Sequence, residues 1–214
     1  MSNVKNNQRG PMELDPGPAD DLTKAPDEEL MLRTGRGEMD AFETLVHRHE
    51  SGLVNYFFRL HWDRYRAEDQ AQEVFLKLYR HSREYEPTAK FTTYMYRIAH
   101  NCWVDDLRRS KHERNQVSLD VQDADGASLR ELVFAMGDDP RDEARKEEVV
   151  EAVIKAVDML PDEHKAVFVL SEIEGMSYLQ ISRILEIPEG TVKSRMHAAV
   201  RKLRERLAAV APRR

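Results

Sequence analysis

The sequence predicts an all-α protein with two small helical domains joined by an acidic flexible linker, the C-terminal domain being a helix-turn-helix domain. Apolar side chains recur at the helical period in two blocks, residues 27–112 and 147–208. The stretch between them, residues 113–146, is acidic, contains glycine and proline, and lacks a sustained apolar period. With 41% hydrophobic and 34% charged residues, the chain suits two thin cores better than one thick core.

The N-terminal block begins after an unpatterned segment. Residues 1–26 are rich in Asn, Pro, Gly and Asp, which predicts a disordered extension. A first helix is expected to begin near Asp27 and to end at Gly35 and Gly37. The second helix has an apolar face, on which we interpret His49 as a hydrogen-bonded core or boundary residue rather than a ligand. This face consists of Phe42, Leu45, Val46, His49, Leu53, Tyr56, Phe57 and Leu60.

A third helix is predicted from about Ala67 to Arg83, after a polar break at residues 61–66. Its inward residues are Val74, Phe75 and Leu78. The opposite surface is of mixed charge and, from spacing alone, is an ordinary solvated face. That surface carries Asp69, Gln72, Glu73, Lys77 and Arg80.

A fourth helix is predicted over residues 91–109, after a loop at residues 85–90 in which Pro87 ends the preceding helix. Phe91, Met95, Ile98 and Cys102 point inward, and order is expected to decay from Ser110. A second stripe, about 100° away, consists of Tyr94, Arg97, Asn101 and Arg108. Such a set can stack on unpaired bases, follow phosphates and bind a base edge, as in single-stranded DNA binding. The alternative is that Tyr94 and Trp103 pack at helix edges and the arginines are merely solvated.

The C-terminal block is predicted to hold four helices over residues 147–208, followed by a tail at 209–214. In the linker we expect one short helix at Leu129 to Phe134. A helix with Val149, Val150, Val153, Ile154 and Val157 comes first in the block, and a second runs through Ala166, Val167, Val169, Leu170 and Ile173.

The last two helices form a helix-turn-helix pattern at residues 175–207. Ser177 and Gln180 make a capping box that starts the first of them, whose apolar face is Tyr178, Ile181, Ile184 and Leu185. Residues 186–190 break the period, and Pro188 suits the first turn of the next helix. That helix packs through a seam of Val192, Met196, Ala199, Val200, Leu203 and Leu207.

The outer surface of the last helix is cationic. Ser194, His197, Ala198 and Arg201 point away from the seam and are flanked by Lys193, Arg195 and Arg204. A helix packed along one side and lined with donors on the other can lie in the DNA major groove. The alternative is a basic amphipathic helix that only solvates a bundle, but capping box, turn and charge together favour DNA binding.

The net charge of −6 conceals two basic regions. Residues 13–43 and 120–151 each carry −7, whereas residues 190–214 carry +7 and residues 90–114 carry +3. Local field rather than total charge governs phosphate binding. The charge distribution is therefore compatible with a nucleic-acid partner at both basic regions.

The sequence disfavours a membrane protein, a metal-binding protein and an enzyme. It shows no membrane span and no signal peptide, and its one cysteine, Cys102, suits a reducing cytosol. His100, Cys102 and His112 are conceivable metal ligands, but His100 and Cys102 point about 160° apart on a helix. No phosphate loop or nucleophile–base pair is present. We therefore expect no metal, no cofactor, no small-molecule substrate and no enzyme activity.

Both blocks resemble the sigma-70 family, specifically its extracytoplasmic-function (group IV) sigma factors. The resemblance covers residues 27–112 and 147–208. It rests on four stretches in order: AFETLVHRH, AEDQAQEVFLKLY, FTTYMYRIAHNCWVDDLRR and LPDEHKAVFVLSEIEGMSYLQISRILEIPEGTVKSRMHAAVRKL. It implies a sigma factor that binds core RNA polymerase and directs initiation at promoter DNA, with no direct membrane insertion.

The resemblance also implies residue roles. Asp69, Gln72 and Glu73 match the helix that docks on core polymerase. Tyr85 through Lys90 match the loop that receives an extruded base of the −10 element. Asn101 matches a residue that helps hold this base, and Tyr94 stands where the family usually has Trp. Arg97 and Arg108 join the −10 set because they share the stripe with these two residues. The part of the last helix that meets the −35 element is matched by Lys193, Ser194, Arg195, His197 and Ala198. Arg201 joins this −35 set because it points outward on the same face.

This sequence departs from relatives that carry Arg at the position of Ala198, so the −35 sequence preference of those relatives does not transfer to it. By the same resemblance we expect control by an anti-sigma factor and a cytoplasmic location, where a membrane-bound inhibitor of this kind would retain the chain at the membrane. The rival reading is a helix-turn-helix repressor that ignores polymerase, which would leave the pattern at residues 67–109 unexplained.

Overall fold

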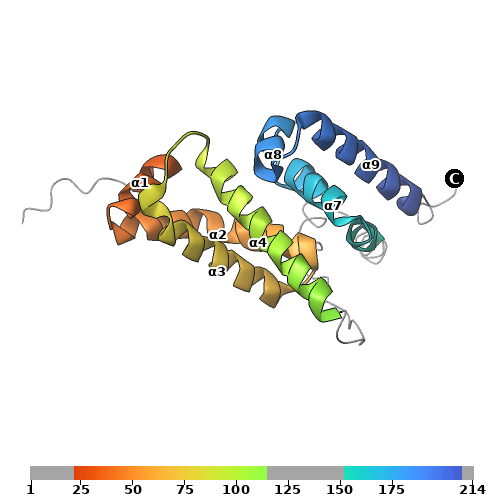
Figure 1. Cartoon of the computed structure of the whole chain (residues 1–214), viewed down its shortest axis with the longest axis horizontal. Helices are drawn as coiled ribbons and strands as arrows, with labels where there is room; N and C mark the ends of the chain where they lie inside the picture. The colour runs from red at the N-terminus through yellow and green to blue at the C-terminus, as the bar shows by residue number, and fades with distance from the viewer. Residues whose placement is uncertain (1–21, 115–151, 209–214) are drawn as a thin grey trace, which may run out of the picture.

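The computed structural model describes residues 22–114 and 152–208 (Figure 1). The predicted N-terminal extension up to residue 21, nearly all of the linker with its short helix, and the tail lie outside these residues. The described part consists of helices and their connections and contains no strand. The predicted all-α class is confirmed.

The N-terminal unit is built from four helices and one short turn. They are α1 (Asp27–Gly35), α2 (Met39–His61), α3 (Arg64–Arg80), the 3-10 turn η1 (Ser82–Glu84) and α4 (Phe91–Arg114). Helix α2 packs on α1 and α3, and α3 packs on α4. The predicted apolar faces form the core, with Leu53, Phe57, Val74 and Met95 almost fully buried.

Helix α3 begins and ends three residues earlier than the sequence pattern predicts. The break after α2 is only two residues long, because Trp62 adopts a left-handed conformation (φ 58°) and Asp63 caps the next helix. The Asp63 side chain accepts a hydrogen bond from the Arg66 N–H at 3.1 Å. Residues beyond Arg80 turn into η1 instead of continuing the helix.

Helix α4 continues to Arg114, so the expected loss of order from Ser110 is wrong. An ion pair explains the difference: Arg66 of α3 pairs with Asp106 and also donates to the Ser110 hydroxyl at 2.8 Å. These contacts hold the last turns of α4 against α3. The helix thereby passes the predicted domain boundary at residue 112.

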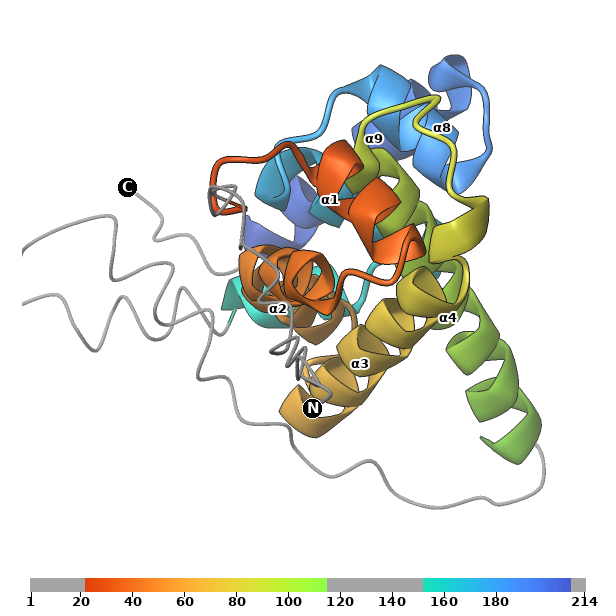
Figure 2. The same ribbon diagram turned by 90° about the vertical axis from the view of Figure 1, so that its left-hand side faces the viewer.

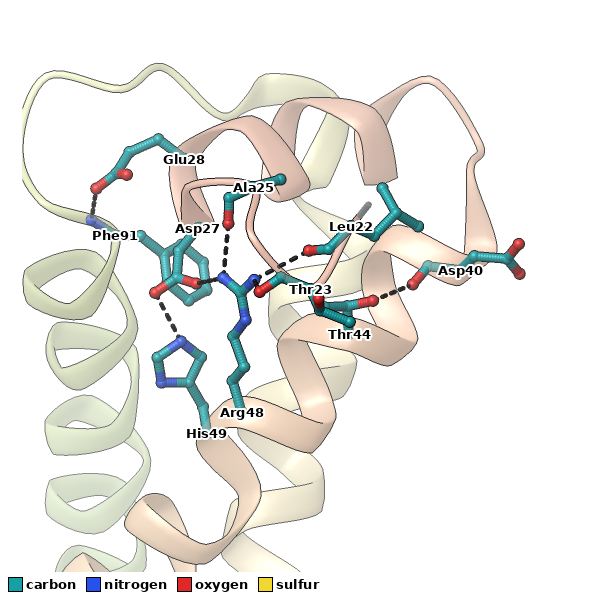
Figure 3. A network of polar contacts seen from close by, with 10 residues as sticks. All are labelled: Leu22, Thr23, Ala25, Asp27, Glu28, Asp40, Thr44, Arg48, His49 and Phe91. Carbon is teal, nitrogen blue, oxygen red and sulfur yellow. Dashed lines mark hydrogen bonds and ion pairs between the residues drawn. The ribbon is translucent and has the colours of Figure 1, made fainter. Parts of the chain in front are cut away.

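The segment before α1 is tied to α2 by a polar network (Figure 3). The Arg48 guanidinium donates to the Asp27 carboxylate at 2.7 Å and to the carbonyls of Leu22, Thr23 and Ala25. His49 contacts the other Asp27 oxygen at 2.8 Å, which confirms its structural role. Residues 22–26 are therefore held in place, unlike the disorder predicted for the whole of residues 1–26.

The C-terminal unit contains helical residues 152–158, α7 (Asp162–Phe168), the π-helical turn η3 (Val169–Ile173), α8 (Tyr178–Leu185) and α9 (Glu189–Leu207). The capping box of Ser177 and Gln180 is present at the start of α8. Of the predicted seam of α9, Val192, Met196, Ala199 and Leu203 are buried. The predicted helix through Ile173 is α-helical only to Phe168 and then widens into η3.

The two units pack on each other, with α4 of the first against α8 of the second (Figure 1). Figure 2 shows the same arrangement from the side, with α8 and α9 beyond the upper end of α4. None of the helices in the two described ranges has the length and apolar character that crossing a membrane requires.

Candidate nucleic-acid and polymerase interfaces

The stripe on α4 presents one aromatic ring and three polar side chains. Arg97, Asn101 and Arg108 are exposed, and Tyr94 is half-buried. The Arg97 guanidinium lies 5.8 Å from the centroid of the Tyr94 ring, within the range of a cation–π contact. The pair supplies a stacking surface and a positive charge side by side, the combination that unpaired bases and their phosphates require.

A cavity of about 580 Å³ lies next to this stripe. Its N-terminal wall consists of Glu84, Tyr85, Glu86, Thr88, Ala89, Thr93, Tyr94 and Arg97, and its opposite wall consists of Arg183 and Glu186 of the C-terminal unit. The predicted −10 loop therefore borders a hollow large enough for a base. Lys90, at the end of this loop, is exposed.

Tyr85 is buried although it lies in a loop. Its side chain is 7% exposed, and its ring centroid lies 5.2 Å from that of Tyr94 and 6.3 Å from that of Phe91. Burial, followed by the nearby Glu28 charge, raises the pKa of Tyr85 to about 12, so its hydroxyl is neutral at pH 7. That buried hydroxyl has no hydrogen-bond partner within the described residues. Tyr85 lines the cavity and supports the Tyr94 ring from behind.

The start of α4 is fixed by a residue that the sequence reasoning missed. The Phe91 N–H donates to the Glu28 carboxylate of α1 at 2.7 Å (Figure 3). The first N–H groups of a helix have no partner within it, so this carboxylate caps α4 from another helix. Gly35 at the end of α1 allows this helix to lie close to η1. A Cβ at Gly35 would be only 2.6 Å from the Ser82 carbonyl oxygen.

Most of the side chains that were predicted to point outward from α9 are exposed. Lys193, Ser194, His197 and Arg201 are exposed, and Ala198 is half-buried. The turn before α9 is fixed by the Ser182 hydroxyl, which donates to the Ile187 carbonyl at 2.7 Å. Glu186 ends α8 in a left-handed conformation. A shallow hollow on this surface is lined by Ser194, His197, Ala198, Val200, Arg201, Arg204 and Glu205.

Arg195 is the exception among the cationic side chains of α9. It donates to the Glu163 carboxylate of α7 at 2.6 Å, and its side chain is only 26% exposed. It also borders a cavity of about 280 Å³ whose other wall belongs to α4, including His100 and Trp103. Arg195 therefore lies at the boundary between the two units.

The predicted polymerase surface on α3 combines polar and apolar character. Asp69 and Gln72 are exposed, while Glu73 pairs with Lys77 at 3.0 Å. Leu76, one turn further on, is 53% exposed. Leu76 is absent from the set of residues predicted for this surface, which are all polar. Gln72 and Leu76 border a groove of about 880 Å³ between α2 and α3. An exposed apolar residue beside a groove is typical of a protein-binding surface.

Two of the conceivable metal ligands, His100 and Cys102, do not converge on a common site in the described part of the chain. Cys102 is buried and accepts a contact from the Lys77 ammonium at 3.1 Å, whereas His100 faces Trp103. In residues 22–114 and 152–208 no three His, Cys, Asp or Glu side chains come together as a possible metal site. The side chain of His112 lies outside the described part.

Family comparisons agree with these two units. Residues 45–113 match the model of sigma-70 region 2, and residues 150–203 match that of sigma-70 region 4. The chain is 31% identical to the ECF RNA polymerase sigma factor SigW of Bacillus subtilis, over 80% of this chain and 91% of that protein. It is 32% identical to the RNA polymerase sigma-H factor of Pseudomonas aeruginosa, over 83% of this chain and 92% of that protein.

Two solved structures share the fold. CnrH in complex with the cytosolic domain of CnrY aligns with a TM-score of 0.62 at 22% identity, covering 86% of this chain and 99% of that chain. The sigma factor RpoE in complex with the anti-sigma factor NepR from Bartonella quintana aligns with a TM-score of 0.61 at 20% identity, covering 78% and 96%.

Proposed function

The chain belongs to the extracytoplasmic-function group of the sigma-70 family, and we propose that it directs transcription initiation through both of its units. It binds core RNA polymerase, places its C-terminal unit on duplex −35 DNA, and captures unpaired −10 bases with its N-terminal unit. The observation that carries the proposal is the presence of both region 2 and region 4 in one chain, each with its cationic helix. We assign the chain no catalysis of its own.

In the N-terminal unit, the −10 base would enter the cavity beside the loop at residues 85–90. Tyr94 would stack on it, Asn101 would bind its edge, and Arg97, Arg108 and Lys90 would contact phosphates. Stacking contributes roughly 1–3 kcal/mol per base, which offsets lost duplex stacking only together with contacts made by polymerase. The protein thus stabilises melted DNA without bond chemistry.

In the C-terminal unit, α9 would lie in the major groove of the −35 element. Lys193, Arg195 and Arg201 would supply salt-dependent affinity through phosphates and base edges, and Ser194, His197 and Ala198 would set base preference. Helix α3 would dock on core polymerase through Asp69, Gln72 and Glu73. The site of action is the cytoplasm, where polymerase works.

We further propose control by an anti-sigma factor. The support is by likeness: of the two structures that share this fold, one is CnrH in complex with the cytosolic domain of CnrY, and the other is the sigma factor RpoE in complex with the anti-sigma factor NepR. Such an inhibitor would cover the polymerase-binding and DNA-binding surfaces, and a membrane-bound one would hold the chain at the membrane.

Transcription with purified components tests the function. Core polymerase and this chain, given a library of randomised duplex promoters, should produce RNA from a selected subset with a shared pair of elements. Core polymerase alone is the control. A helix-turn-helix repressor would bind duplex DNA but would neither copurify stoichiometrically with core polymerase nor support any RNA synthesis, and that result would overturn the proposal.

A further inference from the structure

A polar network ties the segment before α1 to helix α2 (Figure 3). The Arg48 guanidinium, at the surface of α2, donates to the carbonyls of Leu22, Thr23 and Ala25 at 2.9, 2.6 and 2.7 Å. It also donates to the Asp27 carboxylate at 2.7 Å. A guanidinium presents its N–H donors in a fixed plane, so one side chain can hold several acceptors at once. We call residues 22–26 together with Asp27, Arg48 and His49 the Arg48 network.

His49 connects this network to the first residue of α4. Its ring nitrogen lies 2.8 Å from the second Asp27 carboxylate oxygen, and its ring centroid lies 5.4 Å from that of Phe91. The side chains of His49 and Asp27 are only 16% and 20% exposed. A second route runs through the next residue of α1, because the Glu28 carboxylate accepts a hydrogen bond from the Phe91 N–H at 2.7 Å. Both the ring and the backbone N–H of Phe91 are therefore held by residues outside α4.

Phe91 packs against the rings that line the base-sized cavity. Its ring centroid lies 6.3 Å from that of Tyr85, and the Tyr85 centroid lies 5.2 Å from that of Tyr94. Phe91 and Tyr85 are 1% and 7% exposed. Side chains in a close-packed interior cannot shift without moving their neighbours. A displacement of Phe91 would therefore change the orientation of the Tyr94 ring, which the proposed function assigns to stacking on the extruded base.

The Arg48 network begins before the parts of the chain that match the two sigma-70 regions. The residues proposed to contact polymerase or DNA lie within these parts, residues 45–113 and 150–203. Asp27, Glu28 and residues 22–26 precede both, and Arg48 and His49 join them to the first. The segment before region 2 is therefore connected to the base-sized cavity through direct contacts.

We propose that Asp27, Arg48 and His49 are positioning residues for the extruded −10 base. They fix residues 22–26 and α1 against α2 and hold Phe91 at the start of α4, which keeps the Tyr94 ring in the orientation that stacking requires. None of the three contacts DNA in this assignment. The inference rests on the proposed function, because it concerns the site that this function assigns to the extruded base.

Binding to two oligonucleotides separates positioning from stabilisation of the fold. Both are single strands that carry the −10 element selected from the promoter library, and one has an abasic nucleotide at the extruded position. This position is the one at which an abasic nucleotide most weakens binding to the complex of core polymerase with the wild-type chain. Because stacking on one base is lost, that complex should bind the intact strand about tenfold more tightly than the abasic strand.

Arg48→Ala and His49→Ala should weaken binding of the intact strand by up to about tenfold and leave binding of the abasic strand unchanged. Arg36→Ala and His47→Ala are the matched controls, because both residues are exposed and His47 lies two positions before His49 on α2. The controls should keep the wild-type ratio of the two affinities. A network that only stabilises the fold would lower both affinities in parallel, and an unchanged ratio in Arg48→Ala and His49→Ala would overturn the proposal.

Conservative variants keep the test decisive if the alanine variants fold poorly. His49→Phe retains a ring against Phe91 and loses the contact with Asp27, whereas His49→Gln retains a hydrogen-bonding group and loses the ring. Arg48→Lys retains the charge and loses the planar set of donors. Each should show a smaller preference for the intact strand than the wild-type chain does. A full preference in all three would overturn the proposal.

Truncation tests whether residues 22–26 take part. A chain without residues 1–21 keeps the three carbonyls that Arg48 holds and should show the wild-type preference. A chain without residues 1–26 loses these carbonyls and should resemble Arg48→Ala. Equal preferences in the two truncated chains would overturn the role of this segment.

Transcription from the selected promoter separates this inference from the function on which it rests. If the wild-type chain does not support transcription with core polymerase, the proposed function is wrong. If it does, but Arg48→Ala and His49→Ala bind the two strands in the wild-type ratio, only the positioning proposal is wrong.

Discussion

The Glu28 carboxylate accepts a hydrogen bond from the Phe91 N–H at 2.7 Å, so a side chain of α1 caps the helix that carries the −10 stripe. The two residues are 63 positions apart in sequence. Through this bond, the position of α1 determines where the loop at residues 85–90 meets α4. The contact makes Glu28 a positioning residue for the proposed base pocket.

Replacing Glu28 by alanine should therefore destabilise the N-terminal unit by about 1 kcal/mol, as loss of a cap does. Hydrogen exchange should accelerate at the amides of residues 91–94 more than elsewhere in α4. Glu29→Ala is the control, because Glu29 pairs only with Arg33 on the surface of α1 among the described contacts. Uniform acceleration across the whole unit would contradict a local capping role.

Replacing Asn101 by alanine should slow formation of the open complex without weakening the association with core polymerase. Asn101 is exposed, so its loss should leave the fold intact. Permanganate footprinting of unpaired thymines measures the melted DNA, and copurification measures polymerase binding. Melting equal to wild type would remove Asn101 from the −10 site.

Lys193→Ala and Arg195→Ala should each reduce promoter occupancy and its dependence on salt. Loss of one phosphate contact lowers the slope of log affinity against log salt by about 0.9. Arg36→Ala, at the exposed end of α1, is a control of equal charge change. If the slope is unchanged in both α9 variants, this helix does not contact DNA phosphates.

Introducing positive charge on the exposed surface of α3 should disrupt polymerase binding. Asp69→Arg and Gln72→Arg place cations on an exposed surface that is proposed to meet core polymerase, and each should weaken binding at least about tenfold. Glu43→Arg, exposed on α2, should have little effect. Titration of labelled core polymerase measures all three, and equal affinities would place the polymerase surface elsewhere.

Acidification should act on the interface between the units through His100. Burial, followed by the charge of Arg195, lowers the pKa of His100 from 6.5 to about 4. The packed form therefore favours neutral His100, and its stability falls as the pH drops below 6.5. At pH 5.5 the fraction of molecules in which the two units are separated should rise by up to about tenfold through this residue.

Other charged groups border His100 or the interface, so the effect must be isolated. Asp162, Glu163 and Arg108 share the cavity with His100 and Arg195, and burial raises the pKa of Glu174, which opposes opening on acidification. The measurement is the distance between spin labels at Tyr65→Cys and Met159→Cys, two exposed positions in different units, at pH 7.5 and 5.5. It is compared between the otherwise wild-type chain and the His100→Gln variant. An identical pH response in both would exclude His100 as the cause.

The sequence was sufficient to predict what depends on local spacing. The capping box at Ser177, the apolar faces of the helices and the exposure of Lys193 and His197 follow from contacts three or four residues apart, which the helical period reveals. The early start of α3 also had a local signal, since Asp63 is a strong N-cap residue. The left-handed turn at Trp62 had none.

Contacts between distant residues could not be predicted in this way. Tyr96 and Glu174 are 78 positions apart, and no periodicity relates them. The same limitation applies to Tyr85, which lies in a loop but is buried by neighbouring rings. It also explains why α4 continues past Ser110, because the stabilising partner, Arg66, belongs to another helix.

The π-helical turn η3 places Glu174 at the position from which it reaches Tyr96. A turn of this kind contains one residue more than the α-helical turn it replaces. Deleting one residue from Val169–Ile173 would rotate the following side chains by about 100° relative to α7 and direct the carboxylate away from α4. A one-codon change in gene length at this turn could therefore alter the association of the two units while every DNA-contacting side chain remains the same.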